Sequence, residues 1–184
     1  MAQLPSDEQA LAAFLRGESE MFAELVRRYE QPLHAFICRL TGEASEAPDL
    51  FQETFVRVFQ HAASFRGTSR FKTWLYAIAA NVCRSRFRAA APRPAELADP
   101  PDRAPGPNGA AVSHEVGERI ALAVQGLPLE QREVFVLKAY DEMSYPDIAR
   151  ALGRPLGTVK SQMRLALVKL RTALHDLAEA YGHA

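Results

Sequence analysis

The sequence has 184 residues, and its 22 lysines and arginines are balanced by 22 aspartates and glutamates, so the formal net charge is zero. This length allows one domain or two small ones, and a hydrophobic fraction of 48% is sufficient for a buried core. A neutral total argues against a uniformly basic nucleic-acid-binding protein, but not against one whose charges are segregated along the chain.

Neither a targeting segment nor a membrane span is expected. The first ten residues, MAQLPSDEQA, contain no basic region and no apolar run. No stretch approaches the roughly 20 apolar residues that are needed to cross a bilayer. We therefore expect a cytoplasmic protein without membrane insertion.

The first half of the sequence has the periodicity of a helical bundle. Apolar residues at helical spacing predict a short helix over residues 7–16 and a longer helix over residues 22–40. Gly17 and Gly42 mark their C-terminal ends, because glycine tolerates the backbone conformation that terminates a helix. Pro32 should kink or break the longer helix, since proline has no backbone N–H to donate.

A third helix is expected after Ser45, a good N-cap, with Pro48 tolerated in its first turn. Its inward stripe is predicted to consist of Phe51, Phe55, Val58, Phe59 and Ala62. Its polar face carries Asp49, Gln52, Glu53 and Gln60. Because acidic side chains repel phosphate, this face suits a positively charged protein surface.

A fourth helix, predicted over residues 71–88, has two different faces. Trp74 belongs to the apolar face, where we expect it to pack in the core. The opposite face has Asn81 beside residues spaced four apart, namely Lys72, Tyr76, Ala80, Arg84 and Arg88. Residues 55–95 contain no acid, so these cations have no local partner. A solvated charged face is one interpretation, but the ring and the amide among the cations favour a surface for single-stranded nucleic acid.

A proline-rich segment separates the two halves of the chain. Six of the twelve prolines lie between residues 92 and 107, which predicts a linker over residues 91–111. No strand-like alternation of convincing length is present. We therefore expect an all-α protein with two small helical domains, at residues 1–90 and 112–184, joined by a flexible tether.

The segment SYPDIARALGRPLGTVKSQM, residues 144–163, has the layout of a helix-turn-helix. Ser144 can cap the first helix, Gly153 can end it, and Leu156 begins a second helix after Pro155. In such motifs the second helix enters the DNA major groove, whereas an ordinary αα-hairpin is the alternative interpretation.

The sequence shows no sign of catalytic, metal or cofactor chemistry. Cys38 and Cys83 lie in apolar helical patterns, so we expect small buried side chains; a redox pair would require their helices to pack together. The five histidines are scattered, and no catalytic carboxylate pair or nucleophile motif is visible. We therefore predict that the protein is not an enzyme.

Three segments in order resemble a bacterial RNA polymerase sigma factor of the sigma-70 family, in its extracytoplasmic-function group. PDLFQETFVRVFQH resembles the region that grips the polymerase core. FRGTSRFKTWLYAIAANVCRSRFR resembles the region that reads and melts the −10 element. LPLEQREVFVLKAYDEMSYPDIARALGRPLGTVKSQM resembles the −35-binding domain. The resemblance implies a subunit that directs core polymerase to specific promoters and assists promoter melting.

The resemblance also implies partners and site residues. Core polymerase would be bound through its beta-prime clamp and beta flap, with contacts from Asp49, Leu50, Gln52, Glu53 and Phe55. The −10 element would be bound by Ser64, Phe65, Arg66, Lys72, Tyr76, Asn81, Arg84 and Arg88. The −35 element would be bound by Arg154, Thr158, Lys160, Ser161 and Arg164. An anti-sigma factor is an expected further partner.

The second helix of the helix-turn-helix departs from the family pattern. Gln162, Leu165 and Leu167 stand at positions that are often basic, which predicts fewer phosphate contacts and weaker −35 binding. Two other functions stay open at this point. A free-standing helix-turn-helix regulator would not need an acidic partner-binding helix, and a nucleic-acid-processing enzyme would need catalytic residues.

Overall fold

The computed structural model describes residues 4–90 and 111–175, and within these ranges it is helical without a strand. The first range contains α1 (Asp7–Leu15), α2 (Ser19–Thr41), α3 (Ala47–His61), the short 3-10 helix η1 (Ala62–Ser64) and α4 (Phe71–Ala90). The second contains α5 (Ala111–Gln125), α6 (Leu129–Ala139), α7 (Tyr145–Leu152) and α8 (Leu156–Ala173). The all-α prediction is confirmed, whereas the predicted linker lies almost entirely outside the described residues.

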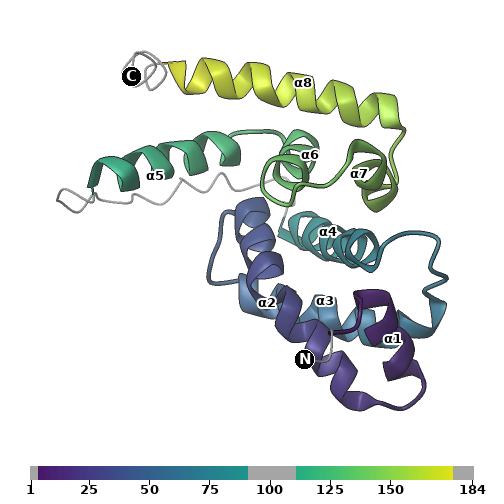
Figure 1. Cartoon of the computed structure of the whole chain (residues 1–184). Helices are drawn as coiled ribbons and strands as arrows, with labels where there is room; N and C mark the ends of the chain where they lie inside the picture. Colours follow the sequence, from purple (N-terminus) through teal and green to yellow (C-terminus); the bar gives the residue numbers. More distant parts are fainter. Residues whose placement is uncertain (1–3, 91–110, 176–184) are drawn as a thin grey trace.

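Helices α1–α4 form one domain and α5–α8 form a second, as Figure 1 shows. The two domains pack directly on each other, with α4 against α7 and α2 against α5 and α6. The sequence predicted two helical domains but not this contact between them.

The ends of the helices follow local sequence signals in most places. Gly42 ends α2 with a φ of 81°, and Gly153 ends α7 with a φ of 62°, both in the left-handed region that favours glycine. The Ser144 side chain accepts a hydrogen bond from the Asp147 backbone N–H at 3.2 Å and so caps α7. These features confirm the helix-turn-helix layout.

Two expectations about the first domain need correction, namely a helix break at Pro32 and a cap at Ser45. Helix α2 continues through Pro32 rather than breaking there. Tyr29, Leu33 and Phe36 are buried on both sides of the proline, so packing holds both halves of the helix on one core despite the missing hydrogen bond. Ser45 does not cap α3: the N-cap position is Glu46, which makes no side-chain capping bond.

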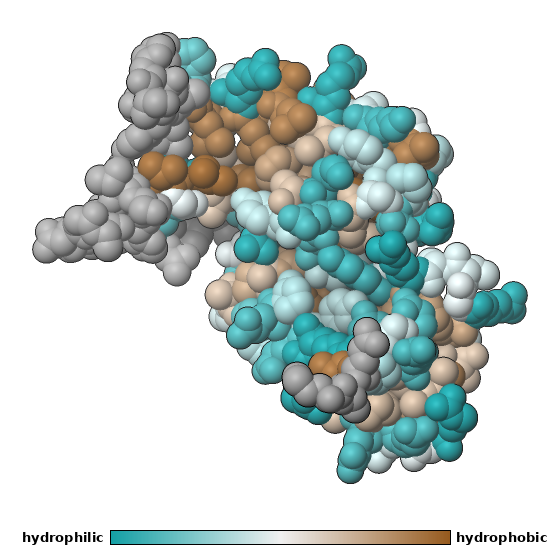
Figure 2. All heavy atoms as spheres, in the orientation of Figure 1, coloured by the Kyte–Doolittle hydropathy of each residue, from teal (hydrophilic) through white to brown (hydrophobic). Residues whose placement is uncertain are grey.

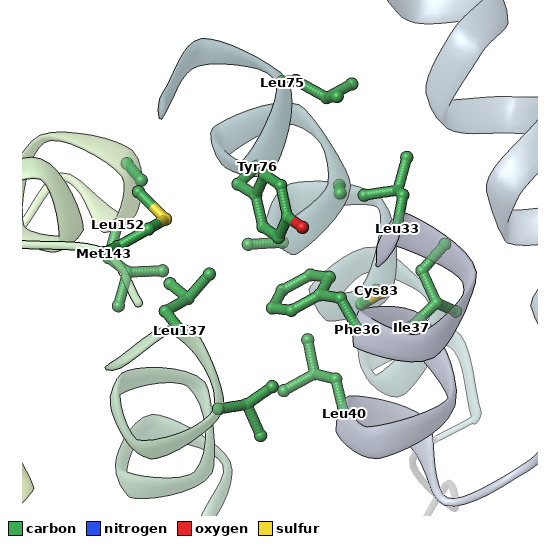
Figure 3. Packing of buried hydrophobic residues seen from close by; sticks show 14 of the residues in the cluster. Leu33, Phe36, Ile37, Leu40, Leu75, Tyr76, Cys83, Leu137, Met143 and Leu152 are labelled. Carbon is green, nitrogen blue, oxygen red and sulfur yellow. The ribbon is translucent and has the colours of Figure 1, made fainter. Parts of the chain in front are cut away.

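One hydrophobic cluster extends through both domains. Figure 3 shows Phe36 of α2 and Tyr76 of α4 beside Leu137 of α6, with Met143 close by. The Phe36 and Tyr76 rings lie 5.0 Å apart between centroids, and both side chains are fully buried. Each buried side chain of this kind contributes about 1.5–3 kcal/mol. The contact between the domains therefore has an apolar centre.

None of the described helices is long and apolar enough to cross a membrane.

Candidate nucleic-acid interface

The predicted basic face of α4 exists, but the second domain covers much of it. Lys72, Tyr76, Ala80 and Arg84 follow one another at helical spacing, as predicted. Tyr76 and Ala80 are fully buried, and Lys72 and Arg84 are half-buried. The expectation that no acid lies near these cations is wrong, because Glu133 and Asp141 approach them from the second domain.

Asp141 is the partner of the N-terminal half of this face. The Tyr76 hydroxyl donates to Asp141 Oδ1 at 2.5 Å, and Lys72 Nζ donates to the Asp141 backbone carbonyl at 2.7 Å. Burial raises the pKa of Asp141, although the Tyr76 hydrogen bond acts in the opposite direction. Burial and the Asp141 carboxylate both raise the pKa of Tyr76. Asp141 Oδ2 is buried and has no hydrogen-bond partner among the described residues.

Glu133 is the partner of the C-terminal half of the face. Its carboxylate is completely buried on α6 and accepts from Arg84 Nε at 2.5 Å and from Arg154 Nη2 at 2.5 Å. Arg84 comes from the predicted −10 surface and Arg154 from the predicted −35 surface. One carboxylate therefore joins the two predicted DNA-binding surfaces.

Further along α4, the predicted nucleic-acid residues are open to solvent. Asn81 and Arg88 are exposed, and together with Arg84 and Arg154 they line a cleft at the domain boundary. Asn81 Oδ1 accepts from Arg84 Nη1 at 2.8 Å, so the amide helps to orient the guanidinium. Its NH₂ group is still available to donate to a base edge.

The loop before α4 combines exposed and anchored residues. Ser64 and Arg66 are exposed, whereas Phe65 is half-buried with its ring 5.3 Å from that of Trp74. The prediction that Trp74 is a packing residue is therefore confirmed. Phe65 thus holds the loop against the domain, while Ser64 and Arg66 lie at its surface.

Sequence reasoning missed the role of Glu8 at the base of this loop. Its Oε1 accepts the Phe71 backbone N–H at 2.8 Å, so α1 caps the N-terminus of α4. That hydrogen bond lowers the pKa of Glu8. The two residues are 63 positions apart, and no local pattern connects them.

The second helix of the helix-turn-helix, α8, presents its polar residues outward. Thr158, Lys160, Ser161 and Arg164 are exposed. The prediction that α8 is anchored inward is confirmed, because its buried residues include Val159, Met163 and Leu170. Unlike these exposed side chains, Arg154 lies just before α8 and is already engaged with Glu133.

The acidic face of α3 is accessible, but two of its predicted contact residues are not. Asp49, Gln52 and Glu53 are exposed, whereas Leu50 and Phe55 are only 5% and 6% exposed and support the face from inside.

An apolar groove that sequence reasoning missed lies beside this acidic face. Phe59 was predicted to point inward, yet 57% of it is exposed, and Val56 beside it is 47% exposed. The groove is lined by these two residues together with Phe22, Val26, Phe51 and Phe55. The exposed position of Phe59 corrects the predicted inward stripe.

The two cysteines are free thiols: Cys83 is buried as expected, whereas Cys38 is only half-buried and its Sγ lies 3.5 Å from His34 Nδ1. Burial raises the pKa of Cys83 to about 12 and also raises that of Cys38. Both thiols are therefore held in the protonated, weakly nucleophilic form.

The sequence matches two family models, one for each domain. Sigma-70 region 2 matches residues 25–93, and Sigma-70, region 4 matches residues 117–170. The chain is 31% identical over 183 residues to the RNA polymerase sigma-H factor of Pseudomonas aeruginosa, across 93% of this chain and 95% of that protein. The chain belongs to the sigma-70 family of RNA polymerase sigma factors.

Further relatives define the group within the family. The sigma factor is 34% identical over 174 residues to the ECF RNA polymerase sigma factor SigW of Bacillus subtilis, across 88% of this chain and 93% of that protein. It is 29% identical over 189 residues to the ECF sigma-E factor of Haemophilus influenzae, across 96% of this chain and the whole of that protein. It is thus an alternative sigma factor of the extracytoplasmic-function type, a promoter-directing initiation factor rather than an enzyme.

Two solved structures resemble this sigma factor as a whole. CnrH, solved in complex with the cytosolic domain of CnrY, has a TM-score of 0.73 and 26% identity, across 94% of this chain and 99% of that one. RpoE of Bartonella quintana, solved with the anti-sigma factor NepR, has a TM-score of 0.67 and 26% identity, across 84% and 96% of the two chains.

The interface between the domains is therefore a contact between regions 2 and 4 of the sigma factor. Lys72, Tyr76 and Arg84 lie in the region 2 match, and Glu133 and Asp141 lie in the region 4 match. Within the described residues, the polar contacts of the predicted −10 surface are thus partly intramolecular.

Proposed function

We propose that this sigma factor binds core RNA polymerase through α3 and promoter DNA through α4 and α8, and that it assists duplex opening in the cytoplasm. The observation that carries the proposal is the separation of charge within region 2. The α3 face exposes Asp49 and Glu53, whereas the loop and the end of α4 expose Arg66 and Arg88. One small domain therefore presents a surface that repels phosphate and another that attracts it.

The polymerase-binding surface combines charge with apolar area. Asp49, Gln52 and Glu53 form an acidic and polar edge suited to a basic partner such as the beta-prime clamp. Phe59 and Val56 beside them supply apolar area that a partner can bury, and aromatic side chains are common at the centre of protein interfaces. Leu50 and Phe55 act from below by holding this surface in shape.

A second protein-binding surface is expected on region 4. Figure 2 shows hydrophobic surface over α5 and α8, and the exposed large apolar residues of these helices are Leu122, Leu156, Leu165, Leu167 and Val168. Leucines that replace basic residues on α8 thus contribute to an apolar surface. We assign this apolar surface to binding of the beta flap.

The domain limits that we propose are residues 1–90 and 112–184, with a linker over residues 91–111.

An anti-sigma factor is the further partner that we propose. Two solved structures that resemble this chain, CnrH and RpoE, were captured with the cytosolic domain of CnrY and with the anti-sigma factor NepR, respectively. A protein that covered the apolar surfaces on α3 or α8 would compete directly with polymerase.

The test is run-off transcription with purified core polymerase and a randomised promoter library. We expect stoichiometric co-elution with core on gel filtration and enrichment of a bipartite promoter. A free-standing regulator would bind DNA without forming the complex with core. Absence of both the complex and template-specific transcripts would contradict the proposal.

A further inference from the structure

We propose that Glu133 is an intramolecular competitor for DNA phosphate, which holds Arg84 of region 2 and Arg154 of region 4 together until DNA replaces it. This inference rests on the proposed function, because it takes both arginines to be DNA contacts. It adds a role for a buried acid that lies on neither predicted DNA-binding surface.

The geometry is that of an anion bound between two guanidinium groups. Each carboxylate oxygen of Glu133 accepts a hydrogen bond from a different arginine, at 2.5 Å in both cases. The arginines are 22% and 18% exposed, and the carboxylate is fully buried. Guanidinium groups bind carboxylate and phosphate with the same donor geometry, so a DNA phosphate is a direct substitute for Glu133.

The charges at this site leave an attraction for a further anion. Two arginines share one carboxylate, and Arg88 lines the same cleft. Glu130 also lines the cleft, but it is exposed and contributes only a screened charge. The positive charge of these arginines is therefore only partly neutralised, and it attracts an incoming phosphate.

The contact between the domains has features of a reversible one. Asp141 keeps one carboxylate oxygen buried without a hydrogen-bond partner in the described structure, which disfavours closure. Separation of the domains would return this oxygen, the Glu133 carboxylate and Arg84 to water, and solvation offsets most of the lost ion pairing. The apolar contacts around Phe36 and Leu137 then provide most of the attraction that DNA must overcome.

The experiment uses the full chain and two charge-neutralising variants on the same helix. Glu133→Gln removes the proposed competitor, and Glu130→Gln removes an exposed negative charge one turn away. The probe is a short mixed-sequence DNA duplex, measured by fluorescence anisotropy at low salt. We expect Glu133→Gln to bind about tenfold more tightly than the parent chain, and Glu130→Gln to bind within about twofold of it. Equal affinities of the two variants would overturn the proposal.

A second pair of variants measures opening without DNA. Arg84→Ala removes the latch from the region 2 side, and Arg88→Ala removes an exposed arginine one turn further along α4. Small-angle X-ray scattering should give a larger radius of gyration for Arg84→Ala and Glu133→Gln than for the other two variants. This arm keeps the test decisive if Glu133→Gln folds poorly, because a compact Arg84→Ala chain would refute the latch.

The two arms separate this proposal from the proposed function. Opening of the chain without tighter DNA binding would refute the competition with phosphate, whatever the transcription assay shows. Transcription by the parent chain together with unchanged scattering of every variant would refute the latch and leave the sigma-factor function intact.

Discussion

The hydroxyl of Tyr76 and the carboxylate of Asp141 are hydrogen-bonded at 2.5 Å across the boundary between regions 2 and 4. Tyr76 is fully buried and Asp141 is 8% exposed. A tyrosine that the sequence places on a nucleic-acid surface is therefore, in this conformation, a contact between domains.

Replacing Tyr76 with phenylalanine should destabilise the packed protein. The change removes the partner of Asp141 Oδ1, and the second carboxylate oxygen already has none within the described residues. An unsatisfied buried acceptor costs about 1–3 kcal/mol, so urea unfolding should show a loss of that size. Tyr145→Phe on α7 is the control and should stay close to the parent chain. A Tyr76→Phe chain as stable as the parent would mean that water replaces the hydroxyl.

The pH dependence of stability should contain a contribution from Asp141. Burial raises the pKa of Asp141 above the ordinary value of 3.8, while the Tyr76 hydrogen bond and the charges of Lys72 and Arg39 act in the opposite direction. The folded form therefore takes up a proton more readily than the unfolded chain. This contribution is fully present below pH 3.8 and is lost as the pH rises through the raised pKa.

Asp141→Asn isolates this contribution, because asparagine cannot titrate but can still accept from Tyr76. The free energy of unfolding of the parent chain, minus that of the variant, should increase as the pH falls from about 7 to about 4. A difference that is flat or slopes the other way would show that the carboxylate is ionised without penalty in the folded protein.

Local sequence signals were sufficient for the ends of several helices but not for the surfaces. Gly42, Ser144 and Gly153 act through their own backbone or their nearest turn, so their effects can be read from adjacent residues. The stripe that contains Tyr76 and Arg84 is equally compatible with solvent, DNA or another domain. Their acidic partners are 65 and 49 residues away, and only the packing of the two domains brings them together.

The acidic face of α3 should determine affinity for core polymerase. Reversal of Asp49 and Glu53 to lysine should weaken the complex about tenfold or more, because it places positive charge against a basic partner. It also places a lysine beside Arg57, which in the parent chain pairs with Glu53 at 2.5 Å. Glu30→Lys, an exposed reversal on α2, is the control. The measurement is a titration of labelled core polymerase, and an unchanged dissociation constant for the double reversal would remove the assignment.

Asn81 and Arg88 should differ in how they affect −10 recognition. An amide can read a base edge, whereas an exposed guanidinium mainly meets phosphate. Asn81→Ala should therefore change the ranking of −10 variants in a competition assay, while Arg88→Ala and Arg84→Ala should weaken all variants about equally. If Asn81→Ala lowered every affinity by the same factor, the role of Asn81 would reduce to orienting Arg84. Its Oδ1 accepts a hydrogen bond from Arg84 Nη1 at 2.8 Å.

The salt dependence of −35 binding should reflect the small number of cations on α8. Lys160 and Arg164 are exposed in the first half of this helix, and leucines stand at positions 165 and 167. Each phosphate contact adds about 0.9 to the slope of log affinity against log salt, so the double variant Lys160→Ala/Arg164→Ala should lower its magnitude by about two. Lys169→Ala, which neutralises an exposed cation further along α8, should leave the slope unchanged. Fluorescence anisotropy of the full chain on −35 duplex across a salt series makes the measurement. A slope that is equally steep for the double variant would show that the phosphates are contacted by other cations.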